Sequence, residues 1–307
     1  MTAAASLFGV WPAVLSPFDE RLEIDTTRLA RHCRALLAAG CRGLSLFGTT
    51  GEGTALSVEE RMASLDAVVL AGVAADRIMP ATGCCDVPSS AALAIHAAEH
   101  GAAGVLALPP FFLRDVGADG IYRHFAATIE RVAAGRNGRV PRFCLYNFPF
   151  HTGITLSPAL VRRLADGFPG IVTGIKDSSS DWILSSAYLE ALPDLDVFVG
   201  DERSLLAALR RGGAGTISGM ANAIAPSVVE LCDKPGQGEA VQGAISGAAE
   251  AVLAHSFVPA MKAALAEHRQ DPAWRRVRPP LEEAAPGLGR IVLGQIRAAG
   301  VSLLPNN

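Results

Sequence analysis

Residues 171–218 read IVTGIKDSSSDWILSSAYLEALPDLDVFVGDERSLLAALRRGGAGTIS, and this stretch decides the fold. Short apolar runs alternate here with longer amphipathic stretches. The apolar runs are continuous in hydrophobicity, which is typical of parallel strands buried on both faces. We therefore predict strands and helices in turn, with strands at Val172–Lys176, Val197–Gly200 and Gly215–Ser218 and helices at Asp181–Leu192 and Ser204–Arg211.

The same alternation extends toward the N-terminus. Five more apolar runs predict strands at Gly9–Leu15, Gly43–Phe47, Ile78–Thr82, Gly104–Leu108 and Arg142–Asn147. The intervening stretches predict helices at Thr26–Ala39, Val58–Val73, Ser89–His100, Ala118–Ala134 and Pro158–Ala165. Eight strand signals separated by helices favour an α/β fold of the (β/α)₈ TIM-barrel type. An open doubly wound sheet is less favoured, because no dinucleotide-binding fingerprint follows the first strand.

After Gly219 the pattern changes to helices alone, predicted at Pro226–Cys232, Glu239–Ala254, Phe257–Glu267 and Gly289–Ala299. We interpret them as the last barrel helix and a C-terminal helical extension. Arg275–Pro280, rich in arginine and proline, is expected to be an extended connector. The predicted domains are residues 1–225, a barrel that carries the active site, and residues 226–307, the last barrel helix with the helical annex.

Composition excludes several classes of protein. Apolar residues make up 50% of the 307 residues and charged residues 19%, which predicts one sizeable core and excludes disorder. A net charge of −3 argues against a nucleic-acid partner. We expect a soluble, cytoplasmic protein without a membrane partner, because the first residues lack a basic signal region and the apolar runs are short. The 6 cysteines lack metal-ligand spacing, so we expect them to be buried and expect no metal site.

Lysine is rare in this chain. Of 27 basic residues only Lys176, Lys234 and Lys262 are lysines. Lys234 lies in a turn and Lys262 on an annex helix, and we predict that both are solvated. Lys176 instead ends an apolar strand, at the end of a barrel where active sites lie. Because a desolvated lysine can lose its proton and attack a carbonyl, we interpret Lys176 as a nucleophile. The alternative is a buried stem whose ammonium pairs with Asp177.

Two further elements fall at predicted strand ends. Tyr146 lies near the end of the strand next to that of Lys176, so its hydroxyl is expected to reach the lysine amine and shuttle protons. An aromatic core layer is the alternative. After the second strand, residues 48–53 read GTTGEG. The two hydroxyls and the glycine-freed backbone N–H groups suit a carboxylate or phosphate, although such a loop alone is most often a turn.

Four motifs occur together in a characteristic order and spacing. They are Gly48-Thr49-Thr50-Gly51-Glu52, Tyr146-Asn147-Phe148-Pro149 followed by Thr152-Gly153, Gly174-Ile175-Lys176-Asp177-Ser178-Ser179, and Gly215-Thr216-Ile217-Ser218. With these motifs the chain resembles the dihydrodipicolinate synthase/N-acetylneuraminate lyase family over nearly its whole length. The resemblance implies a class I aldolase or lyase that forms a Schiff base on a barrel, needs no cofactor and usually assembles as a homotetramer.

The resemblance also implies roles for individual residues. Lys176 would form the imine with pyruvate or another 2-oxo acid, and Tyr146 would relay protons with the help of Thr50. The positions implied to bind the substrate are Thr49, Thr50, Gly51, Gly200 and Ile217. For the distal half of the substrate, Asp201 and Glu202 could hydrogen-bond a polyol or carboxylate, although such a charged cluster is more often a solvated helix start. Asp86 and Arg114 are weaker candidates of the same kind.

Two positions depart from the family pattern. The family's synthases and many of its lyases place a tyrosine after strand four that reaches into a neighbouring subunit, and Phe112 stands there in this chain. A phenyl ring cannot carry a proton, so the relay would use water or another group, or the chemistry differs. The synthases' arginine for the carboxylate of aspartate semialdehyde is replaced by His151. A neutral imidazole cannot form a bidentate pair with a carboxylate, so His151 is either a different recognition group or a plain surface histidine.

The main hypothesis is a carbon–carbon lyase or aldolase acting on pyruvate or another 2-oxo acid with an aldehyde partner. A 2-oxo acid dehydratase or deaminase using the same imine is an alternative. A 4-hydroxy-tetrahydrodipicolinate synthase is a second, weakened by His151 and Phe112. A non-catalytic 2-oxo acid-binding protein is a third, favoured by Phe112. In each case we expect a homotetramer or dimer.

Overall fold

The computed structural model describes residues 7–135 and 138–306. The chain divides into two compact units, of which the first contains Met1–Phe8 and Ala74–Ile217 and the second contains Gly9–Val73 and Ser218–Asn307. Residues 1–6, which the sequence assigns to the barrel, lie outside the described part.

The first unit is built on parallel strands that pair in the order β2, β3, β4, β5 and β6. Their bounds are β2 Val105–Ala107, β3 Phe143–Asn147, β4 Val172–Asp177, β5 Asp196–Val199 and β6 Gly215–Ser218. Each agrees with a predicted strand to within one or two residues. The predicted strand Ile78–Thr82 forms only an isolated bridge, between Ala81 and Leu106. Within it Pro80 has no N–H to donate, although its carbonyl accepts from the Leu106 N–H at 3.0 Å.

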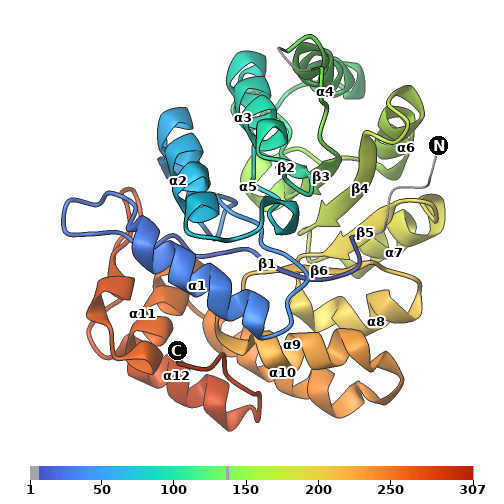
Figure 1. The fold of residues 1–307 in the computed structure, drawn as a ribbon. Coiled ribbons are helices and arrows are strands. Elements are labelled where there is room, and N and C mark those ends of the chain that lie inside the picture. Colours follow the sequence, from blue (N-terminus) through green and yellow to red (C-terminus); the bar gives the residue numbers. More distant parts are fainter. Residues whose placement is uncertain (1–6, 136–137, 307) are drawn as a thin grey trace. The chain divides into compact units, whose positions relative to one another are not determined.

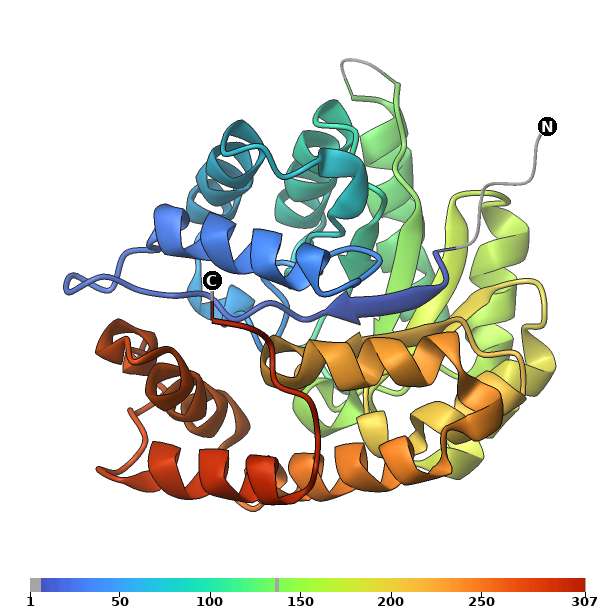
Figure 2. The same ribbon diagram turned by 60° about the horizontal axis from the view of Figure 1, so that its bottom comes forward.

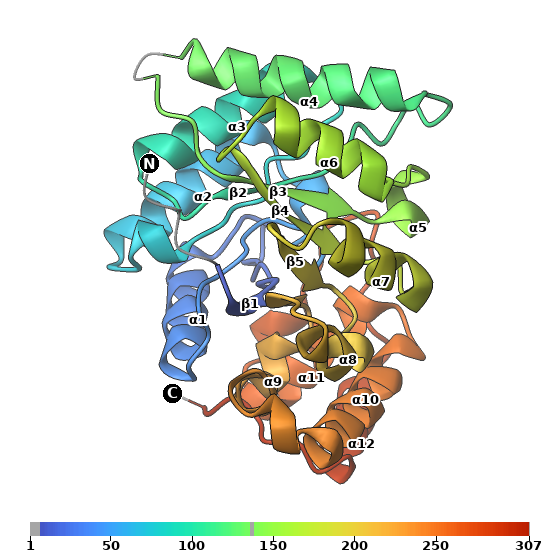
Figure 3. The same cartoon turned by 90° about the vertical axis from the view of Figure 1, so that its right-hand side faces the viewer.

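Helices connect these strands and lie outside them, as Figure 1 shows for α3, α4, α6 and α7. Figure 3 shows α4 and α6 side by side. The bounds are η2 Ala75–Arg77, α3 Val87–Glu99, α4 Ala118–Ala133, α5 Pro149–Thr152, α6 Pro158–Gly167, α7 Trp182–Ala191, η3 Glu202–Ser204 and α8 Leu205–Arg210. Asp86, Ser157 and Asp181 accept hydrogen bonds from the first turns of α3, α6 and α7. Because every strand pair is parallel, the C-terminal ends of β3, β4 and β5 share one edge of the sheet.

The second unit contains β1 and helices from both ends of the chain. Its elements are β1 Gly9–Pro12, α1 Thr26–Ala38, η1 Gly53–Ala55, α2 Val58–Leu70, α9 Ala221–Asp233, η4 Pro235–Gln237, α10 Glu239–Leu253, α11 Phe257–Arg269, η5 Pro272–Arg275 and α12 Leu288–Ala298. Figure 2 shows α10, α11 and α12 as the C-terminal group of helices, with α12 beside α11. The helical C-terminal part is therefore confirmed. The predicted strand Gly43–Phe47 is reduced to one bridge between Ala13 and Ser45.

Two sequence predictions about single residues are wrong. Lys262 is not solvated: its exposure is 0%, and its ammonium forms an ion pair with Glu52. Lys262 lies on the buried face of α11, so its ammonium needs a charged or polar partner within the second unit. Five cysteines are buried as expected, but Cys85 is exposed. Cys85 directly precedes Asp86, the residue that caps the surface end of α3.

Among the described residues, no single helix has both the length and the apolar composition of a membrane span. The pair α10 and α11, bent by 110°, meets the length and composition criteria only when the two helices are taken together.

Candidate active site

Lys176 lies near the C-terminal end of β4, inside the first unit. Its side chain is only 5% exposed. The parallel register places it opposite Tyr146 on β3 and Phe198 on β5, so the three side chains point to the same face of the sheet. The Lys176 Nζ lies 4.2 Å from the centroid of the Tyr146 ring, over its face. The expected neighbourhood of amine and phenol is present, but the amine rests on the ring face.

Gly200 lies close against the lysine stem and Ser178. It follows β5, and its N–H donates to the Asp177 carbonyl at 2.7 Å. A Cβ at this position would lie 3.1 Å from Lys176 Cε and 2.0 Å from Ser178 Oγ. Any larger residue would therefore push the lysine stem or the serine aside. Ile217, another predicted pocket residue, is fully buried on β6.

The carboxylate of Asp177 is held by polar groups. Its Oδ1 accepts from Asn147 Nδ2 at 2.8 Å and from the Ser179 N–H at 3.0 Å. Its Oδ2 accepts from the hydroxyls of Ser179 at 2.9 Å and Ser185 at 2.6 Å. These four bonds account for the carboxylate, so the alternative interpretation, an ammonium of Lys176 paired with Asp177, is not what the structure contains. Asn147 and Asp177 instead tie the end of β3 to the end of β4 (paired as register partners).

Asn147 and Asp177 are residues whose role sequence reasoning missed. Asn147 Oδ1 also accepts from the Leu156 N–H at 2.9 Å, so one amide joins two strand ends to the following loop. The sequence did contain a signal for them: Asn147 directly follows Tyr146, and Asp177 directly follows Lys176, each at the end of an apolar strand.

The helix α5 directly after β3 was also missed, and it carries His151. Its four residues begin at Pro149 and end before Gly153, whose φ of 67° is left-handed. The His151 ring meets the Phe148 ring edge-on at 4.5 Å, and Phe148 stacks on Tyr146 at 5.7 Å. Partial burial lowers the pKa of His151, so the imidazole is neutral at pH 7.

Arg114 lies next to this helix. A Cβ on Gly153 would meet Arg114 Cδ at 2.6 Å, so the arginine stem runs over the glycine that ends α5. Arg114 is exposed and follows Phe112 in the loop after β2. The first unit therefore places a guanidinium beside the segment that holds His151, although the residue at the family's arginine position is a histidine.

Asp201 and Glu202 have different surroundings. Asp201 caps η3 and accepts from the Arg203 side chain at 3.0 and 2.7 Å. Burial alone would raise the pKa of Asp201, but the hydrogen bonds from Arg203 outweigh it and lower the pKa. Glu202 is buried. The helix-start interpretation describes Asp201 better than substrate contact does.

The loop with Thr49, Thr50 and Gly51 belongs to the second unit. The N–H groups of Glu52 and Gly53 donate to the carbonyls of Thr49 and Gly48 at 3.1 and 3.0 Å. These two N–H groups are therefore used within the loop. The hydroxyls of Thr49 and Thr50, both on half-buried residues, are the groups suited to a ligand carboxylate.

Phe112 projects from the loop after β2. It is 81% exposed, and its neighbour Leu113 is 69% exposed. This loop therefore exposes two adjacent apolar side chains.

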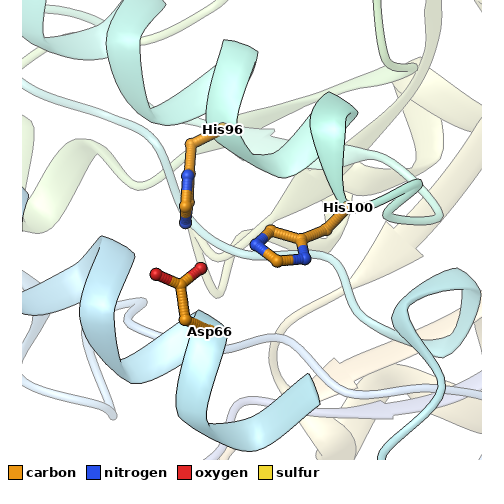
Figure 4. A group of neighbouring side chains, drawn as sticks. All are labelled: Asp66, His96 and His100. Atoms are coloured by element: carbon orange, nitrogen blue, oxygen red, sulfur yellow. The ribbon is translucent and has the colours of Figure 1, made fainter. Parts of the chain in front are cut away.

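Two histidines offer a different kind of chemistry. His96 lies in the last turn of α3 and His100 directly follows the helix, with ring centroids 4.9 Å apart in an edge-on arrangement (Figure 4). Figure 4 also labels Asp66, which belongs to α2 of the other unit. The end of α3 leads into the N-terminal end of β2, so this pair lies at the opposite edge of the sheet from Lys176. Imidazoles spaced four residues apart on a helix can share a metal ion, but they take no part in the site at β4.

Comparison with known proteins identifies the family. Residues 6–285 match the dihydrodipicolinate synthetase family. The chain is 34% identical to 4-hydroxy-tetrahydrodipicolinate synthase of Thermus thermophilus over 239 residues, which covers 77% of this chain and 76% of that protein. It is 30% identical to an uncharacterized DapA-like lyase of Chloroflexus aurantiacus over 84% of this chain and 85% of that protein.

A solved structure agrees with the sequence relatives. The crystal structure of dihydrodipicolinate synthase from Agrobacterium tumefaciens superimposes with a TM-score of 0.88 at 33% identity, covering 95% of this chain and 99% of that one. In this chain Lys176 is a buried lysine near a parallel strand end and faces Tyr146. The chain belongs to the dihydrodipicolinate synthetase family and is a carbon–carbon lyase of the class I aldolase type.

Proposed function

We propose that this enzyme is a Schiff-base lyase that cleaves or forms a carbon–carbon bond between pyruvate, or another 2-oxo acid, and an aldehyde. We also propose that the α/β fold closes as a (β/α)₈ barrel over residues 1–225. The observation that carries the proposal is the position of Lys176, 5% exposed and with its Nζ 4.2 Å over the Tyr146 ring. In this proposal the Lys176 amine is the nucleophile that attacks the ketone.

The chemistry follows from an amine at that position. Lys176 Nζ adds to the keto carbon of the 2-oxo acid, and loss of water gives a protonated imine. In the cleavage direction the imine draws the electron pair of the bond between C3 and C4 of a 4-hydroxy-2-oxo acid. The 4-hydroxyl gives up its proton as the aldehyde leaves, and the enamine that remains takes up a proton at C3. Hydrolysis then releases the 2-oxo acid and the free amine.

Other residues have proposed roles around that step. Tyr146 relays protons during dehydration and hydrolysis of the adduct, with Thr50 as its partner. Thr49, Thr50 and Gly51 bind the carboxylate of the 2-oxo acid. Gly200 and Ile217 line the space for its methyl end. No step needs a metal or an organic cofactor.

Reduction with borohydride in the presence of pyruvate tests the nucleophile. The wild-type chain should gain the mass of one reduced pyruvate adduct. Lys176→Arg should gain none, because arginine remains protonated and cannot form the imine. The same change at an exposed lysine, Lys234→Arg, is the matched control and should react as the wild type does. An adduct of undiminished yield in Lys176→Arg would refute the assignment.

The relatives' names favour one particular acceptor, aspartate semialdehyde, and therefore a 4-hydroxy-tetrahydrodipicolinate synthase. The neutral His151 in place of the family's arginine argues for a different acceptor. If the acceptor carries a carboxylate, the guanidinium of Arg114 is a candidate partner for it, because the Arg114 side chain lies close to Gly153. Turnover with aspartate semialdehyde, compared with a panel of uncharged aldehydes and 2-oxo-3-deoxy sugar acids, distinguishes these acceptors.

A non-catalytic 2-oxo acid-binding protein is the second candidate, and Phe112 favours it. Without the family's relay tyrosine the imine could form and yet not turn over. This candidate predicts a trapped adduct on Lys176 and no consumption of any substrate in the panel. The lyase predicts the same adduct together with consumption of a substrate.

A further inference from the structure

The second unit contains a buried ion pair outside the imine chemistry. Lys262 on α11 is 0% exposed and Glu52 is 4% exposed. The Lys262 ammonium donates to Glu52 Oε1 and, at 2.7 Å, to the Arg276 carbonyl. Glu52 Oε2 accepts from the Arg278 N–H at 2.8 Å. Both charges therefore have polar partners, which is the condition under which a buried pair is tolerated.

Glu52 is the last residue of the Gly48–Glu52 motif, three positions after Thr49. It adopts a left-handed conformation with φ 55° and ψ 30°, and Phe47, just before the motif, has φ 59°. Such conformations are unfavourable for residues with a side chain and persist where the surroundings hold them. The loop is therefore strained at both ends, and the carboxylate of Glu52 anchors one of those ends.

The helix α11 meets the motif at a second point. A Cβ on Gly219 would lie 2.7 Å from the Phe257 ring and 3.2 Å from Thr50 Oγ1, so both side chains lie against this glycine. Phe257 is the first residue of α11, and Lys262 is five residues further along the same helix. One helix of the annex thus lies close to the hydroxyl of Thr50 and bonds directly to Glu52.

A third anchor comes from the chain that follows α11. The Arg278 guanidinium pairs with Glu60 on α2 at 2.9 and 2.7 Å and donates to the carbonyl of Ala55 at 2.9 Å. Ala55 ends the short helix η1 that follows Glu52. The segment 276–278 therefore holds the motif from its C-terminal side, while Lys262 holds it from α11.

We infer that the buried pair Lys262–Glu52 positions the Thr49–Thr50 loop to bind the carboxylate of the 2-oxo acid. This inference rests on the proposed function. Lys262 and Glu52 act through the loop and do not touch the substrate, so they are positioning residues. Their removal should weaken 2-oxo acid binding while the rate at saturation is kept.

The test measures how borohydride trapping depends on the pyruvate concentration. Lys262→Met and Glu52→Gln should each raise the half-saturating concentration about tenfold and leave the limiting rate within about twofold. Lys234→Met makes the same chemical change at an exposed lysine and should match the wild type. All assays are run at a temperature at which circular dichroism shows each variant folded.

The double variant Glu52→Gln/Lys262→Met separates positioning from stability. A neutral buried pair removes the uncompensated charge, so thermal stability should recover relative to Lys262→Met. The half-saturating concentration should stay raised, because the ionic anchor of the loop is still missing. A stability role alone would return both properties to the wild-type values.

Each outcome decides between the two proposals. If the wild type forms no adduct at Lys176, the proposed function fails. If the wild type forms the adduct and Glu52→Gln has the wild-type half-saturation, the positioning role is wrong and the proposed function stands. Should Lys262→Met not fold, Glu52→Gln decides alone, because it keeps the size of the buried side chain.

Discussion

Lys176 gains its chemical character from its neighbours. Tyr146 covers it on one side, and Gly200, which has no side chain, lies against its stem on another. Asp177, which could have neutralised the ammonium, is bonded to Asn147, Ser179 and Ser185 instead. Lys176 is therefore buried at a strand end, and its close neighbours are the Tyr146 ring and Gly200.

Adding one methyl group at Gly200 should disturb that arrangement. In Gly200→Ala the new carbon would lie 3.1 Å from Lys176 Cε and 2.0 Å from Ser178 Oγ. We expect the rate of adduct formation with pyruvate to fall about tenfold, because misplacement of a reacting group by a fraction of an ångström is costly. Rapid-quench borohydride trapping measures this rate. Gly236→Ala, where nothing lies within 4 Å of the added carbon, is the control. Equal rates in both variants would show that Gly200 does not shape the site.

The Asn147–Asp177 contact should matter for stability. Asn147→Ala removes one bond to the buried carboxylate and one to the Leu156 N–H. We expect a loss of about 2 kcal/mol in the free energy of unfolding, because a buried polar group that loses its partner is costly. Urea denaturation followed by circular dichroism measures the loss. A change below about 0.5 kcal/mol would mean that water replaces the amide at both positions.

At the scale of elements, His32 links three helices of the second unit. It lies on α1, its Nε2 is 2.9 Å from Asn222 Oδ1 on α9, and its Nδ1 is 3.0 Å from an Arg269 nitrogen on α11. Its ring also packs edge-on against Trp274. Burial, with a contribution from Arg269, lowers the pKa of His32 to about 3. The imidazole of His32 in the folded protein is therefore neutral at neutral and mildly acidic pH.

This histidine should make stability depend on pH. Between pH 6.5 and about 3 the unfolded chain binds a proton at His32 that the folded chain does not bind. The contribution of His32 to the free energy of unfolding is then fully present above pH 6.5. It falls as the pH drops, by up to about 1.4 kcal/mol per pH unit. His32→Gln should reduce the slope of the unfolding free energy against pH, measured between pH 4 and 6, by the equivalent of about one bound proton. His255→Gln, at an exposed histidine, is the control; a slope unchanged in His32→Gln would contradict the assignment.

For the whole molecule, the exposed apolar side chains of the first unit suggest association. Phe112 is 81% exposed, Phe150 85% and Ile183 81%. We predict that the chain forms a dimer or tetramer and that Phe112→Asp weakens it, because a charge at a desolvated contact is unfavourable. Light scattering over a dilution series measures the mass. Leu70→Asp, at a residue 90% exposed in the second unit, is the control. A wild-type chain that stays monomeric at micromolar concentration would contradict the prediction.

Much of the fold could be predicted because it depends on local patterns. Apolar strand runs and capped helices are short-range signals, and the strands β2 to β6 fall where they were expected. The two strand signals that failed have local causes: Pro80 lacks a donor, and Phe47 is left-handed. The helix α5 has four residues, too few to show a periodicity.

The site was predictable only in part. Lys176 and Tyr146 were expected to be neighbours, and the register places them opposite each other. Their catalytic roles, and those of Thr49, Thr50, His151 and Phe112, stay predictions. The burial of Lys262 could not be foreseen, because its partner Glu52 is 210 positions away in the chain. The sequence signal that Lys262 has a special environment was the rarity of lysine, since the chain has only three.

The most direct test of the imine at Lys176 is a peptide map of the wild-type protein after reduction with pyruvate. Three lysines are available, and only the peptide that contains Lys176 should carry the reduced adduct. Its yield should rise with pyruvate concentration and saturate at one adduct per chain. An adduct on Lys234 or Lys262 instead, or unmodified Lys176 at saturating pyruvate, would contradict the account.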